Sequence, residues 1–525
     1  MPQTKASILV KNTKWIYISK LFSQLFGLLA TILVIRQLEV SVFGAYNLLL
    51  SSFVVFEILA LSAVSNVFNR YIPELIANKE HHKLNRFIKG GIVYSFLLFS
   101  ALVLTLYFLR DSFSSFFNIE DFDKYLIAFF IFIYANFLQI ISGVVLKALL
   151  LHKKTAIVTI FSNAIRLIFY IYFAQRLDVN LLLYIESFIG LFFLITSVFI
   201  YLAIKNKFVQ QKPDNNITPV TFKRVKRYGL LSMVNELGVG IVGKTSDYFI
   251  VAAMSSPLQV GLFAFAHRIY GIVFKILPFN DIQTVIRPLF FQKYSKEYDI
   301  KEFQKMYSFM IKLLLPIYIF PAIYFFFFGR SIISIVFDPK YIDAYWITII
   351  VLLSNVFLAF FFPLALTVQL KERMDILFYS KIVAVFSIIA GILGMKYFGV
   401  LGVAIASLIG NLLKNLFIVF FMRDYPEIRF NYKDFLNFLF IGFLLMPFAL
   451  LQPIVISGYL IIILTLFFII YIAFLTIIFS PFNDYDKQIL QKIVSSNSLL
   501  MKIYIFVVKL STLLPSLANN KRKRL

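Results

Sequence analysis

Residues 179–204 read VNLLLYIESFIGLFFLITSVFIYLAI, and Glu186 is the only charged residue among them. A helix that crosses a bilayer needs about 20 mostly apolar residues. Stretches of this kind recur along the whole chain of 525 residues, of which 60% are hydrophobic and only 15% are charged. An ordinary soluble domain is about 45–50% apolar and about 25% charged. The sequence therefore predicts an all-α polytopic membrane protein and excludes large soluble domains.

Cutting the chain at clusters of charged residues, Pro, Gly and Asn predicts about 14 transmembrane helices. The distribution of charge orients them, because 36 of the 51 Lys and Arg residues fall in alternate segments, 7 in the other loops and 8 within spans. Segments rich in Lys and Arg face the cytoplasm, so both termini are predicted to be cytoplasmic. The predicted spans are residues 14–36, 42–70, 87–109, 124–147, 155–175, 179–204, 228–253, 257–286, 306–328, 342–369, 375–396, 400–422, 435–452 and 455–479.

These spans group into five predicted parts. The basic loop between the two halves has no folded domain with a reading element, so we interpret it as a solvated face near anionic lipid and expect no nucleic-acid partner. The parts are an N-terminal lobe of six spans (1–204), a basic cytoplasmic linker (205–227), a C-terminal lobe of six spans (228–422), two extra helices (423–481) and a cytoplasmic amphipathic and basic tail (482–525).

The two lobes contain an internal repeat. VFGAY at 42–46 corresponds to VGLF at 260–263, which aligns Gly44 with Gly261. Arg70 and Arg287 end the corresponding spans at the same offset along the chain. Both copies begin in the cytoplasm, which predicts a parallel repeat. Transporters built from parallel repeats place the substrate site at the interface between the copies.

At these positions the sequence resembles the polysaccharide flippases of the multidrug/oligosaccharidyl-lipid/polysaccharide (MOP) exporter superfamily. The resemblance covers about residues 14–422, and the last two spans fit the fourteen-span members. It implies two pseudo-symmetric six-helix lobes in a V shape around a central cavity. The motifs that carry it are FGAY at 43–46, RYIPE at 70–74, VGLFA at 260–264 and GVLGVAIA at 399–406.

The resemblance also implies a function. A flippase of this family moves a lipid-diphosphate-linked oligosaccharide from the inner to the outer leaflet of the bacterial cytoplasmic (inner) membrane, for surface polysaccharides such as lipopolysaccharide O-antigen or capsule. The expected partners are a polyprenyl-diphosphate oligosaccharide, membrane lipids and the polysaccharide polymerase machinery. No covalent bond is broken, so the protein is expected to be a transporter without catalytic residues, metal or cofactor.

Two alternatives stay open. A drug/cation antiporter of the same superfamily would need an anionic cavity, whereas the predicted spans hold eight basic and five acidic residues. A membrane polymerase or ligase of lipid-linked glycans would need a large outer loop with catalytic groups. The longest predicted outer loop has about fifteen residues. Both comparisons favour the flippase.

Several short motifs match patterns of soluble enzymes. Residues 238–245 match the P-loop pattern GxxxxGKT, but they lie inside a predicted span and no strand precedes them. The D-x-D pairs at 121–123 and 484–486 are interpreted as capped or solvated acids. The pair at 81–82, two His residues, lacks the Cys or carboxylate ligands of a metal site. We expect none of these motifs to carry chemistry.

Charged residues within the spans are the strongest functional candidates, because a charge at the centre of a bilayer is costly. We expect five of the basic residues to line the cavity and bind the diphosphate: Arg166, Lys244, Arg268, Lys275 and Lys20. Glu57, Glu236 and Asp247 are candidates for ion coupling or for pairing with these cations. Internal ion pairs are the alternative for each residue. Lys312, Lys381 and Lys414 lie near predicted cytoplasmic ends and can extend toward water.

Overall fold

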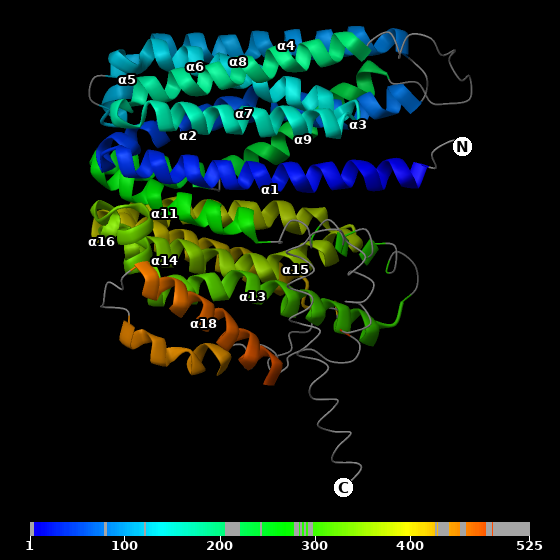
Figure 1. Ribbon diagram of the computed structural model, residues 1–525. Coiled ribbons are helices and arrows are strands. Elements are labelled where there is room, and N and C mark those ends of the chain that lie inside the picture. Colours follow the sequence, from blue (N-terminus) through cyan, green and yellow to red (C-terminus); the bar gives the residue numbers. More distant parts are fainter. Residues whose placement is uncertain are drawn as a thin grey trace. The chain divides into compact units, whose positions relative to one another are not determined.

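A computed structural model describes most of the chain. The described residues are 5–77, 81–119, 122–204, 221–241, 244–277, 298–425, 440–451 and 458–478, with a few isolated residues between 283 and 294 and at 428 and 486. Every regular element within these ranges is helical, which confirms the all-α fold class (Figure 1). The α-helices are α1 (Lys5–Gln37), α2 (Val40–Ala60), α3 (Ser62–Ala77), α4 (His81–Phe108), α5 (Arg110–Phe116), α6 (Phe122–Ala148), α7 (His152–Tyr172), α8 (Val179–Ile204), α9 (Phe222–Ile241), α10 (Lys244–Met254), α11 (Pro257–Ile276), α13 (Ile300–Ile332), α14 (Tyr345–Ser354), α15 (Leu358–Leu370), α16 (Met374–Phe421) and α18 (Gly458–Ile478).

The described part contains nine helical stretches that are long and apolar enough to cross a membrane. This confirms a multi-pass membrane protein, while the number fourteen stays a prediction. One of the nine, α16, is 48 residues long and contains the predicted span 375–396 and all but the last residue of the predicted span 400–422. Shorter apolar stretches at Leu21–Gln37 and Gly458–Ile472 lie in the first and last of the predicted spans.

Helix α16 is a hairpin of two arms, 374–398 and 400–421, that meet at Gly399. This residue has φ 61° and ψ −148°, a backbone conformation that only glycine adopts easily. The arms lie against each other, because a Cβ added to Gly394 would stand 2.6 Å from the carbonyl oxygen of Gly402. A Cβ on Gly410 would stand 2.5 Å from the Cβ of Ser387. We call this element the α16 hairpin.

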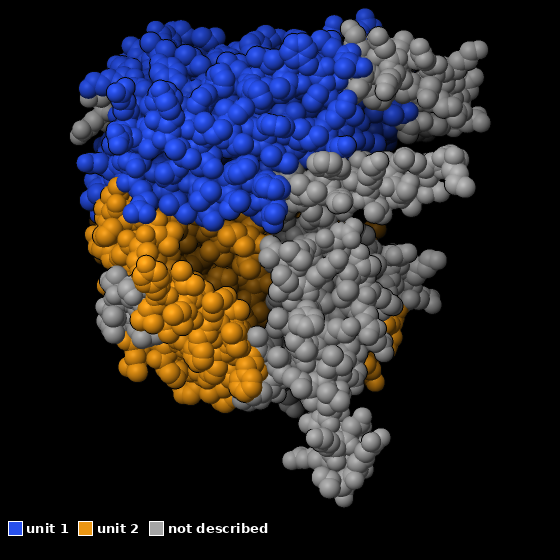
Figure 2. All heavy atoms as spheres, viewed as in Figure 1, with its two compact units in different colours: residues 1–264 blue, residues 265–525 orange. Residues whose placement is uncertain are grey.

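The chain divides into two compact units, residues 1–264 and 265–525, with the boundary inside α11 (Figure 2). In unit 1, α6 packs against α8, α3 packs against α9, and α1 runs alongside α7 (Figure 1). In unit 2, α13 packs against α14 and α15, and both of these pack against α16. The lobe boundaries predicted from the sequence stay predictions.

Two predicted boundaries differ locally from the structure. Helix α9 begins at Phe222, so residues 222–227 of the predicted linker are helical. A cluster of Lys and Arg suggests a loop, but both residues are good helix formers and the helix extends through them. The predicted span 42–70 is two helices, α2 and α3, divided at Leu61. The tail 482–525 lies outside the described residues except for Asp486.

Helices α2 and α11 cross with their backbones in contact at Gly44 and Gly261. A Cβ on Gly44 would overlap the carbonyl oxygen of Pro257, and a Cβ on Gly261 would overlap that of Val40. The contact is reciprocal: each glycine faces the carbonyl four residues before the other. Because Val40 and Pro257 have the same offset in the sequence as the two glycines, the crossing joins equivalent positions of the predicted repeat.

Candidate functional site

Three candidate acids lie on helices of unit 1 that pack against one another. Glu57 is on α2, Glu236 on α9 and Asp247 on α10, and each of these helices contacts the other two. Asp247 is buried, with 8% of its surface exposed. Glu57 and Glu236 are half-buried, and their side chains have no hydrogen bond or ion pair to any residue that the structure describes. Unit 1 therefore gathers the carboxylates that the sequence suggested for ion coupling.

Arg166, on α7, is held by a network of polar side chains. Its Nη2 donates to Glu186 Oε2 at 2.9 Å, and its Nη1 donates to Asn163 Oδ1 at 2.6 Å. The Tyr170 hydroxyl donates to the other oxygen of Glu186 at 2.5 Å. The two charged side chains are 22% and 12% exposed. The internal pairing that the sequence left open is thus present at Arg166, where Glu186 balances the positive charge.

The other candidate cations divide between the units. Arg268 and Lys275 lie on α11 in unit 2, seven residues apart and so on one helical face. Arg268 is half-buried and Lys275 is exposed. Lys20 lies in α1 and Lys244 begins α10, but their side chains lie outside the described part. A common cavity lined by these five residues stays a prediction.

A charged and aromatic cluster joins α3 to α9, and sequence reasoning missed it. Arg224 donates to both carboxylate oxygens of Glu74, at 2.6 and 3.4 Å. The guanidinium carbon of Arg70 lies 5.1 Å from the ring centroid of Tyr228 and 5.7 Å from that of Tyr71. The motif at 70–74 and the basic run before 228 were both visible in the sequence. Their pairing depends on how two helices that are distant in the sequence pack together.

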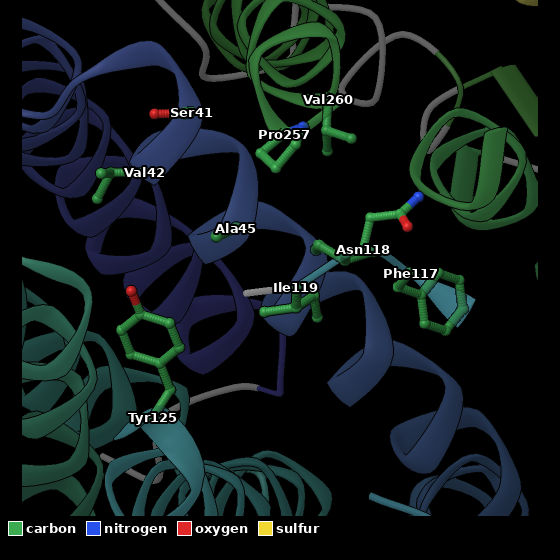
Figure 3. Close-up of a pocket in the computed structure, with 10 residues that line it drawn as sticks. Ser41, Val42, Ala45, Phe117, Asn118, Ile119, Tyr125, Pro257 and Val260 are labelled. Carbon is green, nitrogen blue, oxygen red and sulfur yellow. The ribbon is translucent and has the colours of Figure 1, made fainter. Parts of the chain in front are cut away.

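A cavity of about 140 Å³ lies in unit 1 beside the crossing of α2 and α11 (Figure 3). Asn118, with φ 51°, turns the chain there, and its amide donates to the carbonyl oxygen of Ala252 at 3.4 Å. Figure 3 shows Tyr125 reaching toward the cavity from the side opposite Pro257. None of the described residues that line the cavity is charged. It therefore does not suit a diphosphate.

The structure also bears on the motifs of soluble enzymes. The P-loop match begins in α9 and ends in α10, with residues 242–243 outside the described part. A helix precedes it, whereas a P-loop follows a strand. Asp123 lies 3.6 Å from Arg110, and Asp121 is outside the described residues. The side chains at 81–82 are outside them too. Within the described part, no group of three His, Cys, Asp or Glu residues is placed to hold a metal.

Asp486 corrects the sequence interpretation. It is 1% exposed, not solvated, and its Oδ2 lies 3.2 Å from Lys312 Nζ. Lys312 was expected to extend toward water, but it is 4% exposed. Both predictions were wrong because each residue was judged alone. Two opposite charges can be buried when each neutralises the other.

Comparison with known proteins identifies the family. Residues 9–293 match the family model described as "Polysaccharide biosynthesis protein". The chain belongs to this family. Solved structures with a fold similar to that of this chain are also known. The lipid II flippase MurJ in an inward closed conformation aligns with a TM-score of 0.65 at 18% identity, over 88% of this chain and 98% of that one.

A second solved structure has a similar fold. An inward-facing multidrug resistance MATE family transporter of the MOP superfamily aligns with a TM-score of 0.59 at 15% identity, over 77% of this chain and 94% of that one. No curated protein sequence matches this polysaccharide biosynthesis family member. The resemblance to proteins of polysaccharide biosynthesis is confirmed by the family match. At these identities the structural matches show the fold alone.

Proposed function

We propose that this polysaccharide biosynthesis family member is a flippase. It moves a lipid-diphosphate-linked oligosaccharide from the inner to the outer leaflet of the bacterial cytoplasmic membrane, with both termini in the cytoplasm. The observation that carries the proposal is the family match over residues 9–293. The similarity of fold to a lipid II flippase, over nearly all of that chain, supports it.

The in-membrane cations fit the chemistry of such a cargo. Arg268 and Lys275 form a cationic stripe on α11, and Lys20 and Lys244 add positive charge on α1 and α10. Arg binds a diphosphate bidentately, whereas Lys acts as a point charge. Arg166 contributes less, because Glu186 balances it. In this proposal the isoprenoid tail stays in lipid, and the Phe and Tyr side chains stack on the sugars.

The acids on α2, α9 and α10 would couple transport to an ion gradient. Glu57 and Glu236 are half-buried, and their carboxylates have no partner among the described residues, so they are the candidates to bind the coupling ion. The same observation favours the second candidate function, a drug/cation antiporter, whose fold is also similar.

Deletion of the gene separates the two functions. A flippase deletion should accumulate lipid-linked saccharide on the inner leaflet and leave resistance to cationic drugs unchanged. The accumulation is measured by extracting the lipid-linked saccharides and testing which of them an external glycosidase reaches. Normal export together with increased drug sensitivity would instead identify the antiporter.

A further inference from the structure

Arg70, in the second half of α3, is an exposed cation that two aromatic rings hold in place. Its guanidinium carbon lies 5.1 Å from the ring centroid of Tyr228 and 5.7 Å from that of Tyr71. Rings at these distances attract a guanidinium group and restrict its movement. The side chain has no hydrogen bond or ion pair to any residue that the structure describes. Within that part of the chain, its N–H donors are therefore available to a ligand.

The carboxylate nearest along α3 is already bound to another arginine. Glu74 accepts hydrogen bonds from Arg224 of α9 at 2.6 and 3.4 Å. The guanidinium carbon of Arg224 lies 5.5 Å from the ring centroid of Tyr71, whose hydroxyl donates to the carbonyl oxygen of Arg224 at 3.3 Å. Two guanidinium groups thus contact Tyr71, and Glu74 neutralises one of them. The positive charge of Arg70 has no counterion among the described residues.

Further basic residues lie at the level of Arg70. The ring centroid of Tyr71 is 5.8 Å from that of Tyr228 on α9 and 6.5 Å from that of Phe87 on α4. Each residue of a helix adds about 1.5 Å of height, so the neighbours of these two rings lie within about one turn of Arg70. The exposed basic neighbours are Arg86, Lys89, Lys226 and Arg227.

This level is where the apolar part of the three helices ends. No charged residue lies on α4 between Lys89 and Arg110. There is none on α9 between Arg227 and Glu236, and none on α3 before Arg70. The end rich in Lys and Arg is the predicted cytoplasmic end. Lipid phosphates lie at the edge of the hydrocarbon core, so Arg70 is predicted to lie at the depth of the phosphates of the inner leaflet.

We propose that Arg70 binds a phosphate group of a lipid in the inner leaflet. The guanidinium group donates two N–H bonds to the phosphate oxygens. Tyr71 and Tyr228 position the guanidinium group, and the pair Glu74–Arg224 holds α9 against α3. This ligand chemistry is shared by the headgroup of an anionic phospholipid and by the diphosphate of the proposed cargo. The second source rests on the proposed function, whereas the first does not.

The test measures how tightly the purified full chain binds phosphatidylglycerol and undecaprenyl diphosphate, by native mass spectrometry. Arg70→Gln should weaken the binding of at least one of these lipids about tenfold, because it removes hydrogen bonds to a charged group. Arg70→Lys should restore the binding only in part, since Lys lacks the bidentate fork. Tyr228→Leu should weaken the binding as well, whereas Tyr228→Phe, which keeps the ring, should not.

Arg86→Gln is the matched control, because it removes the same charge from an exposed position at the same level of α4. Unchanged binding of both lipids by Arg70→Gln, or an equal loss in Arg86→Gln, overturns the proposal. If Arg70→Gln fails to fold, as judged by circular dichroism, equal binding by the two Tyr228 variants overturns it instead.

The two lipids distinguish the sources of the phosphate. A loss confined to undecaprenyl diphosphate assigns the site to the cargo, and a loss of phosphatidylglycerol assigns it to phospholipid headgroups. Because export is not measured, the protein can fail as a flippase and still bind phosphatidylglycerol at Arg70.

Discussion

Lys312 and Asp486, far apart in the sequence, form an ion pair that is nearly closed to solvent. The Nζ–Oδ2 distance is 3.2 Å, and the side chains are 5% and 1% exposed. Lys312 belongs to α13, whereas Asp486 follows the last described helix. The pair therefore joins the beginning of the predicted cytoplasmic tail to α13.

Removing one partner of this pair should destabilise the protein. Asp486→Ala leaves the lysine buried without its carboxylate, which costs about 3–5 kcal/mol. We expect a lower melting temperature for the purified protein. The double variant Lys312→Met/Asp486→Leu should recover most of the loss, because two apolar side chains of similar size need no neutralisation. An unchanged melting temperature for Asp486→Ala would show that the pair contributes nothing.

Arg166 and Glu186 should stabilise the protein as an ion pair, so that losing one partner is partly offset by neutralising the other. Arg166→Ala leaves a half-buried carboxylate whose remaining hydrogen-bond partner among the described residues is Tyr170, so we expect less protein in the membrane. Adding Glu186→Gln should restore much of the amount, as measured by immunoblotting of membrane fractions. If Arg166→Ala is present in normal amount and export is lost, Arg166 acts on the cargo instead.

Arg268 tests the proposed transport mechanism most directly. Arg268→Ala should abolish export while the protein still inserts, and Arg268→Lys should restore export only in part, because Lys lacks the bidentate fork. Lys275→Ala should be milder, since Lys275 lies about 10 Å further along α11. The measurement is inner-leaflet accumulation of lipid-linked saccharide, with Lys301→Ala, an exposed residue at the start of α13, as control. Normal export by Arg268→Ala contradicts the mechanism.

The predicted topology can be tested by labelling single introduced Cys residues, because the native chain has no Cys that would react with the reagent. A single Cys at Ser256, an exposed residue between α10 and α11, should react with an impermeant thiol reagent added to intact cells. A single Cys at position Asn215, in the predicted linker, should react only after the cells are opened. Labelling of the Asn215 variant in intact cells would place the linker outside.

Span length and charge bias predicted the fold class because both are local properties of the sequence. The turn at Gly399 falls in the gap between two predicted spans for the same reason. The pairs Glu74–Arg224 and Lys312–Asp486 could not be predicted from the sequence, because each pair joins segments that are far apart in the chain. Glu186 was recognised as an acid within a span, but its choice of Arg166 depends on which faces of α7 and α8 meet. Sequence patterns identify the charged residues, and packing decides their partners.

The reciprocal contact of Gly44 and Gly261 limits how far the two halves of the chain can diverge. After a duplication, each copy normally accumulates mutations on its own. Here a side chain gained in one copy would collide with the backbone of the other, at Val40 or at Pro257. A substitution at either glycine therefore disturbs the packing of both α2 and α11. The two positions are therefore expected to stay glycine together, although they belong to different copies of the predicted repeat.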